Sequence, residues 1–270
     1  MDKKRQAFEK ICKDIKSIKI QGARNVAKAG LKAYTLNPSM QAKRKLIGLR
    51  PTEPMLKHVL ELADSHPYKE ILTHFDQSQK KINLLVLKII KNKEIIFTHC
   101  HSTNVVRSLI YAKKKGKNFA VHNTETRPLF QGRTTAKELE KNKIPVTIFV
   151  DSAFASALFK SQTTKKVDKI FLGADALTSS GIINKVGSRA IAELAHNHHI
   201  PLFVIADSWK YSKEPILIES RKGSEVWQGA PKKIKIKNPA FEFVPKNYIT
   251  KIITEKGNNS YDAFLKKVAH

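Results

Sequence analysis

The sequence predicts an α/β protein in which a helical N-terminal domain, residues 1–92, is followed by an α/β domain, residues 93–270, with a mainly parallel sheet. Three observations predict it. Apolar residues recur at helical spacing up to Asn92, short apolar runs alternate with helical patterns after it, and those runs are apolar throughout. Strands without polar alternation are buried on both faces, which is typical of a parallel sheet covered by helices.

The N-terminal helices are indicated by three- and four-residue spacing between Asp2 and Asn92. Prolines at positions 38, 51, 54 and 67 mark the breaks between them. The apolar residues that carry the spacing are Phe8, Ile11, Ile15, Ile18, Met55, Val59 and Leu60.

The α/β domain contains five predicted strands, read as EIIFTH, NFAVHNT, PVTIFV, KIFLGAD and PLFVIAD. Amphipathic helices are predicted between them at Thr103–Lys115, Thr134–Asn142, Ser152–Gln162 and Gly187–Asn197. No repeat or low-complexity linker separates the domains, so we place the boundary near residue 90.

Composition restricts the classes of protein to consider. Two cysteines exclude a disulfide framework, and no N-terminal stretch resembles a signal peptide, so a cytoplasmic protein is expected. The most apolar window, Ile82 to Ile90, is too short to span a membrane. The formal net charge of +27 favours anionic partners. Lysine clusters are not interleaved with aromatic residues, so nucleic acid is not expected.

Ionisable or reactive residues follow every predicted strand. They are Cys100, then Glu125 and Arg127, then Asp151, then Asp175, then Asp207 and Lys210. Ligands of open parallel sheets bind beyond the carboxyl ends of the strands, so these residues together favour a site at that edge. A single aspartate there is more often a helix cap.

Cys100 lies between two histidines in FTHCHS, and three interpretations compete. A metal site is disfavoured because neighbours on an extended segment point to opposite faces. The histidines at 196, 198 and 199 fit a solvated helix end. A reactive thiol fits better, because Ser102 and Thr103 resemble a helix start, which binds anions and lowers a thiol pKa. An inert buried cysteine remains open on this segment alone.

Several strings resemble one known family. ETRPLFQGR, LGAD and INKVGS, together with THCHS, IPVT and DSA, are similar to the superfamily of initiation factor 2B regulatory subunits, methylthioribose-1-phosphate isomerase and ribose-1,5-bisphosphate isomerase. QGARNVAKAG, LRPT, NPAFEFVP and ITKIITEKG extend the match over nearly the whole chain. The resemblance implies a helical domain followed by a Rossmann-like domain.

The family contains enzymes and non-catalytic subunits, and the resemblance implies an enzyme here. Its isomerases use a cysteine in the THC string and an aspartate in the GAD string, which match Cys100 and Asp175. By resemblance Asp175 is the acid that opens the sugar ring, and Cys100 is the base that moves the C2 proton. Apolar neighbours of Asp175 would keep its carboxyl protonated.

The same resemblance implies a set of substrate-binding residues. Lys210 resembles a lysine that binds the second phosphate in ribose-1,5-bisphosphate isomerase. The full set is Gly22, Ala23, Arg24, Arg50, Ser102, Thr103, Asn104, Gln131, Asn184, Lys185 and Lys210. One departure is Gln21, where many isomerases carry an arginine, and Arg24 is a candidate to replace that charge.

The expected function is therefore an aldose-ketose isomerase acting on a ribose 1-phosphate type substrate, with ribose 1,5-bisphosphate as the preferred candidate. The alternatives are methylthioribose-1-phosphate isomerase and a non-catalytic regulatory subunit. The resemblance also implies a homo-oligomer, a dimer or a hexamer. No cofactor or metal is expected, because the proton transfers need neither.

Overall fold

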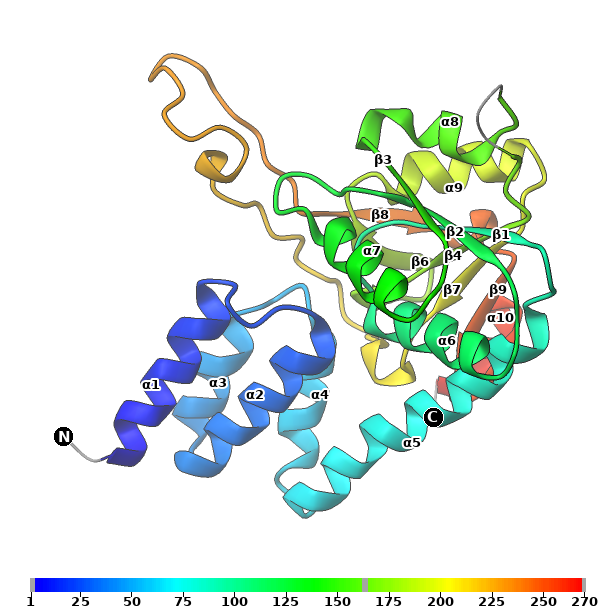
Figure 1. The fold of residues 1–270 in the computed structure, drawn as a ribbon. Coiled ribbons are helices and arrows are strands. Elements are labelled where there is room, and N and C mark those ends of the chain that lie inside the picture. Colours follow the sequence, from blue (N-terminus) through cyan, green and yellow to red (C-terminus); the bar gives the residue numbers. More distant parts are fainter. Residues whose placement is uncertain (1–2, 162–164, 269–270) are drawn as a thin grey trace.

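The computed structural model describes residues 3–161 and 165–268. Asp2 and Gln162, at the ends of two predicted helical regions, lie outside the described residues. So do Met1, the first residue of the predicted helical domain, and His270, the last residue of the predicted α/β domain. The chain begins with helices and continues as a helix-covered sheet (Figure 1), which confirms the predicted α/β class.

The N-terminal helices are α1 (Lys3–Lys16), α2 (Ala23–Leu36), α3 (Met40–Gly48), α4 (Pro54–Leu62) and α5 (Tyr68–Ile89). Proline sets the starts of the last two, since Pro54 is the first residue of α4 and Pro67 precedes α5. Phe8 and Ile15 of α1 pack with Val26 and Leu46 in a buried cluster, so the spacing read from the sequence does mark the buried faces.

Helix α5 contributes to two cores. Its first half places Ile71 and Phe75 in a cluster with Met55 of α4 and with residues of α2. Its second half places Ile82 and Val86 against the sheet. The helical and α/β parts therefore share one continuous helix, and the division at residue 92 stays a prediction.

The large sheet has the order β10-β9-β7-β4-β1-β2-β3, with β10 as its antiparallel strand. The strand order reverses between β1 and β4, and loops at such a switch point leave a crevice for ligands. The strands are β1 (Ile95–Thr98), β2 (Ala120–Thr124), β3 (Val146–Phe149), β4 (Lys169–Leu172), β7 (Leu202–Ile205), β9 (Lys251–Thr254) and β10 (Gly257–Asn259).

Helices cover both faces of this sheet. Ile96 of β1 faces a cluster with α5, α6 and α7, and Phe97 faces one with α8, α9 and α10. Figure 1 shows α6 and α7 on the opposite side of the sheet from α8 and α9. These helices are α6 (Thr103–Lys114), α7 (Gln131–Lys141), α8 (Phe154–Leu158), α9 (Ser188–Asn197) and α10 (Tyr261–Val268).

Two predicted helices differ in extent. Helix α7 begins three residues before the predicted start. The residue before it, Phe130, has a left-handed conformation with a φ of 57° and is the last residue of the preceding loop. Helix α8 is shorter than predicted, because a separate 3-10 turn, η1 (Asp151–Ala153), comes before it and the helix ends at Leu158. The apolar spacing in the sequence predicts a single helix here and does not distinguish η1 from α8.

A second, antiparallel sheet was not predicted. It consists of β5 (Ala176–Leu177), β6 (Gly181–Lys185) and β8 (Phe241–Pro245), in the order β5-β6-β8. It carries Asn184 and Lys185, and it starts directly after Asp175. Between β7 and β8 the chain forms the turn η2 (Ser208–Lys210) and then a long segment, 212–238, whose tip extends away from the sheet (Figure 1).

Two short turns remain. The turn η3 (Gly223–Glu225) lies within the extended segment, and η4 (Lys246–Tyr248) follows β8. Among residues 3–161 and 165–268, no helix combines the length and apolar character needed to cross a bilayer.

Candidate active site

A cavity lies at the carboxyl ends of β1 and β4, where the strand order reverses. Loops from the N-terminal helices and residues of the small sheet complete its wall. Of the residues proposed from the sequence, those that line it are Gly22, Arg24, Arg50, Cys100, Ser102, Thr103, Asn104, Gln131, Asp175, Asn184, Lys185 and Lys210. The fold thus gathers residues from seven separate stretches of chain.

Ala23 does not belong to this wall. It is the first residue of α2, and its side chain is buried in the cluster with Met55 and Phe75. The preceding Gly22, with a φ of 80°, turns the chain into the helix and does line the cavity. Of this predicted pair, Gly22 therefore lies at the cavity, whereas the first turn of α2 points Ala23 into the core.

Cys100 is held in a left-handed conformation, with φ of 66°, that non-glycine residues seldom adopt. Its amide donates to Thr126 Oγ1 at 3.0 Å, and its carbonyl accepts from Thr135 Oγ1 at 2.8 Å. These bonds fix the turn that aims the side chain. Such strained positions often mark functional sites.

Burial raises the pKa of the Cys100 thiol to about 11, and Lys185 acts against this shift. The expectation that a helix start would favour the thiolate is therefore corrected, because loss of water around the sulfur outweighs the nearby positive charge. Cys100 rests as a neutral thiol.

The flanking histidines have structural partners. His99 Nδ1 contacts Thr124 Oγ1, and its Nε2 lies 2.9 Å from the carbonyl of Val186. His101 Nδ1 lies 3.0 Å from Thr135 Oγ1. His99 thus links the end of β2 to the loop before α9, and His101 contacts α7, so the two rings help to fix the segment around Cys100.

Asp175 follows β4 and begins the turn into the small sheet. Burial raises the pKa of its carboxyl, while Lys210, Lys185 and Arg50 act in the opposite direction. Lys210 is itself buried, and its Nζ donates to the carbonyl of Ala174 at 2.5 Å. A carboxyl with this environment retains a proton at a higher pH than a solvated aspartate.

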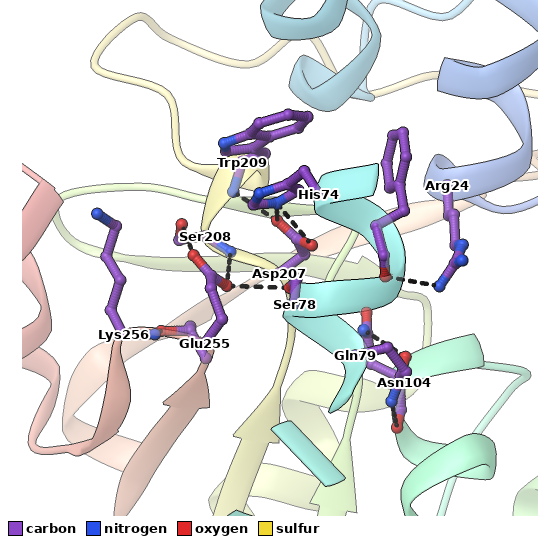
Figure 2. Close-up of polar contacts among 12 residues, drawn as sticks. Arg24, His74, Ser78, Gln79, Asn104, Asp207, Ser208, Trp209, Glu255 and Lys256 are labelled. Carbon is purple, nitrogen blue, oxygen red and sulfur yellow. Dashed lines mark hydrogen bonds and ion pairs between the residues drawn. The ribbon is translucent and has the colours of Figure 1, made fainter. Parts of the chain in front are cut away.

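The turn that carries Lys210 is anchored on α5, as Figure 2 shows. Asp207 accepts from the Trp209 amide at 3.0 Å, and His74 Nε2 lies 3.1 Å from the same carboxylate. The His74 ring also stacks on Trp209, with ring centroids 3.4 Å apart and planes 4° from parallel. Lys210 therefore comes from a rigid turn.

Helix α5 also holds Arg24 and Asn104 (Figure 2). Asn104 Nδ2 donates to Gln79 Oε1 at 3.0 Å. Arg24 donates to the Phe75 carbonyl at 3.0 Å (Figure 2). It also donates to Asp76 at 2.6 Å. Because its guanidinium is already bound to α5, Arg24 replaces the missing charge at Gln21 only if it gives up these partners.

The remaining strand-end residues do not line the cavity. The Asp151 carboxylate accepts from the amides of Thr126 and Arg127, at 2.8 and 2.6 Å, and so fixes the loop after β2. Glu125 pairs with Arg133 at 2.6 Å. The expectation that every strand end supplies the site is thus met at three of them, after β1, β4 and β7.

Sequence reasoning missed Glu53, Gly173, Arg221 and Phe241, which line the cavity. Glu53 directly follows the RPT string and Gly173 lies within LGAD, so both carried a local signal. Phe241, which reaches the cavity from β8, lies within NPAFEFVP and so carried one too. Arg221 carried none, since it reaches the cavity from the extended segment.

One group among the described residues could hold a metal, with ligand atoms within 4.8 Å of one another. It consists of His74, Asp207 and Glu255. Glu255 accepts from Ser208 and Ser78, and Asp207 accepts from Trp209 and contacts His74 (Figure 2). These bonds explain the cluster without an ion.

Comparison with known proteins places this architecture. The model of the initiation factor 2 subunit family matches residues 40–260. The chain belongs to the initiation factor 2 subunit family. Proteins similar to the chain include the ribose 1,5-bisphosphate isomerases of Pyrococcus furiosus and Methanocaldococcus jannaschii. The Pyrococcus furiosus protein is 32% identical to this chain, and the match covers 94% of this chain and 90% of the relative. The Methanocaldococcus jannaschii protein is 33% identical, and the match covers 95% of this chain and 91% of the relative.

A further similar protein has another named activity. The methylthioribose-1-phosphate isomerase of Dehalococcoides mccartyi is 34% identical, over 67% of this chain and 59% of its own. Among solved structures, the Pyrococcus horikoshii translation initiation factor eIF-2B has a TM-score of 0.81 at 23% identity, covering 94% of this chain and 96% of that one. At that identity the likeness establishes the fold.

Proposed function

We propose that the protein is an aldose-ketose isomerase that converts ribose 1,5-bisphosphate to ribulose 1,5-bisphosphate. The observation that carries the proposal is the composition of the cavity at the strand switch point. It brings together a thiol, a carboxyl with a raised pKa and several basic side chains, among them those of Arg50, Lys185 and Lys210. The relatives that cover most of the chain bear that name.

The phosphate at C1 prevents ordinary ring opening at the anomeric oxygen, so the ring C–O bond must break while the phosphate stays attached. An acid protonates the ring oxygen, and a base removes the C2 proton. The raised pKa of Asp175 suits the acid. Reprotonation at C1 then gives the ketose.

Cys100 is the base in this proposal, although it rests as a thiol. The reactive form carries a thiolate at Cys100 and a proton on Asp175, and it is a minor form of the free protein. A base with a pKa of about 11 is strong once formed. Lys185, which favours the thiolate, promotes that form.

The anionic groups of the substrate would bind the basic part of the wall. Lys210 and Arg50 are both buried, so their charges act on a ligand with little screening by water. The backbone amides at the start of α6, after Ser102, offer further donors to a phosphate.

Phosphorus NMR of ribose 1,5-bisphosphate tests the proposal, with wild type, Cys100→Ser and Asp175→Asn in parallel. Wild type should form ribulose 1,5-bisphosphate, and both variants should lose turnover by about 10²-fold or more. Asp262→Asn is the matched control, because Asp262 pairs with Lys246 on the exposed surface. Full turnover by either site variant contradicts its assigned role.

Two other functions are outcomes of the same assay. Turnover of methylthioribose 1-phosphate in place of the bisphosphate would favour the second isomerase activity. Binding of both sugars without turnover would favour a regulatory subunit. Cys100 and Asp175 in one cavity favour the enzyme over that subunit.

We also propose a cytoplasmic homo-oligomer, a dimer or hexamer. Its support is exposed apolar surface on the extended segment, at Val226, Trp227 and Ile234, and on the edge strand β3, at Ile148. Light scattering after size-exclusion chromatography measures the mass directly. A monomer at micromolar concentration would contradict this proposal and leave the isomerase proposal untouched.

A further inference from the structure

A buried ion network in the cavity wall has no part in the proposed acid-base chemistry. Arg50 and Glu53 are 5% and 2% exposed. One guanidinium nitrogen of Arg50, Nη2, pairs with Glu53 Oε1, and its Nε donates to Glu219 Oε1 at 3.0 Å. Arg50 is thus held between the buried carboxyl group of Glu53 and the partly buried carboxyl group of Glu219.

Two atoms of this network have no hydrogen-bond partner among the described residues. They are Arg50 Nη1, a donor, and Glu53 Oε2, and both are buried. A buried polar atom without a partner costs about 1–3 kcal/mol. Since both residues line the cavity, an anion bound there is the candidate partner for both atoms, once the side chains shift to expose them.

The ionisation of Glu53 decides which ligand fits. As a carboxylate, Glu53 competes for Arg50 and repels an anion. As a carboxylic acid, it releases Arg50 Nη2 and can donate its own proton to an anion oxygen. An anion at Arg50 therefore favours the protonated form of Glu53.

The charges around Glu53 make both forms accessible. Arg50 and Lys210 face it as cations, and Asp175 and Glu219 face it as acids. Burial is the largest influence and raises the pKa of Glu53 to about 7, with Arg50 opposing and the two acids adding to the shift. Glu53 is thus divided between its two forms near neutral pH.

We propose that Arg50 and Glu53 form a proton-coupled subsite for a tetrahedral dianion, such as a phosphate ester. On binding, one proton from solvent adds to the Glu53 carboxylate, Arg50 exchanges that carboxylate for the anion, and Glu219 stays bound to Arg50. Arg50 Nη1 and the new Glu53 O–H both donate to the anion. The proposal rests on the proposed function only in taking a phosphate group as the natural ligand.

Sulfate is the probe, because its charge stays constant between pH 6 and 9. Bound sulfate should protect Cys100, which lines the same cavity, against alkylation by iodoacetamide. At each pH the measured quantity is the ratio of the Cys100 alkylation rates with and without sulfate. Neither step requires turnover. Failure of the isomerase assay and failure of this subsite are therefore separate results.

In wild type the apparent affinity for sulfate should fall by up to about tenfold per pH unit above pH 7. Glu53→Gln, which is permanently neutral and nearly isosteric, should bind with little pH dependence from 6 to 8. Glu61→Gln is the matched control on the same helix, because Glu61 is exposed beside Lys57, and it should behave as wild type. An unchanged slope in Glu53→Gln overturns the proposal, as does a flat wild-type profile or no protection by sulfate.

A measurement on wild type alone avoids any folding defect of the variants. Calorimetric titration with sulfate in two buffers of different ionisation enthalpy reports the protons taken up. About half a proton per sulfate is expected at pH 7, falling toward zero at pH 5.5. A titration that shows no proton uptake at pH 7 would contradict the proposal.

Discussion

Gly173, directly after β4, packs against Ser102, directly before α6. A Cβ placed on Gly173 would lie 2.5 Å from Ser102 Oγ and 2.6 Å from Ser102 Cβ. Ser102 caps α6 and accepts from the Val105 amide. This contact brings the carboxyl ends of β1 and β4 close together, and with them the loops that carry Cys100 and Asp175.

Gly173→Ala should therefore displace the start of α6. We expect a loss of about 1–3 kcal/mol of stability from the overpacked contact. Turnover should fall at least about tenfold, because small displacements of reacting groups are costly. Thermal unfolding and the kcat/KM of the isomerase assay check both. Gly48→Ala is the matched control, since nothing lies within 4 Å of its new methyl. Equal activity in the two variants would contradict the argument.

The thiol of Cys100 should react slowly with iodoacetamide near neutral pH. Burial raises its pKa to about 11, so the rate should climb about tenfold per pH unit through pH 9 without a plateau. Lys185→Met removes the cation that favours the thiolate and should slow alkylation further. Lys246→Met, at an exposed surface pair, should not. Alkylation of Cys100→Ser gives the contribution of Cys12. A plateau near pH 8 would show a thiolate instead.

The pH profile of kcat/KM should report Asp175. If the reactive form is a Cys100 thiolate with a protonated Asp175, the profile is flat between the two pKa values and falls below the pKa of Asp175 and above about 11. Lys210 is the largest influence that lowers the pKa of Asp175. Lys210→Met should therefore move the acid limb to higher pH, besides weakening substrate binding. An acid limb that stays in place argues against Asp175 as its source.

His74 should act on substrate binding through the turn that carries Lys210. His74→Phe keeps a ring to stack on Trp209 but removes the contact with Asp207. We expect KM for the bisphosphate to rise several-fold with a smaller change in kcat, and stability to fall by about 1 kcal/mol. In a Lys210→Met background the same change should leave KM unaltered. His66→Phe, at an exposed histidine, is the control. A KM effect that persists without Lys210 would contradict this route.

Several parts of the fold were predictable from local pattern. The five predicted strands form five of the seven strands of the large sheet, because a buried parallel strand reads as an apolar run bounded by turns. The small sheet was not predictable. Strand β5 has two residues, and β6 pairs with β8 about sixty residues later in the chain, so neither carries a periodic signal of its own.

The sequence by itself determined the α/β class and the family, and it singled out Cys100 and Asp175 as residues at strand ends. Residue identity and order are sufficient for those conclusions. Tertiary structure alone decided that the Cys100 thiol stays protonated, that Ala23 faces the core, and that Glu53 shares Arg50 with Glu219. The physical reason is that burial and charge pairing depend on which distant segments the fold brings together. Glu219 meets Arg50 across 169 residues of chain, and no local pattern records that contact.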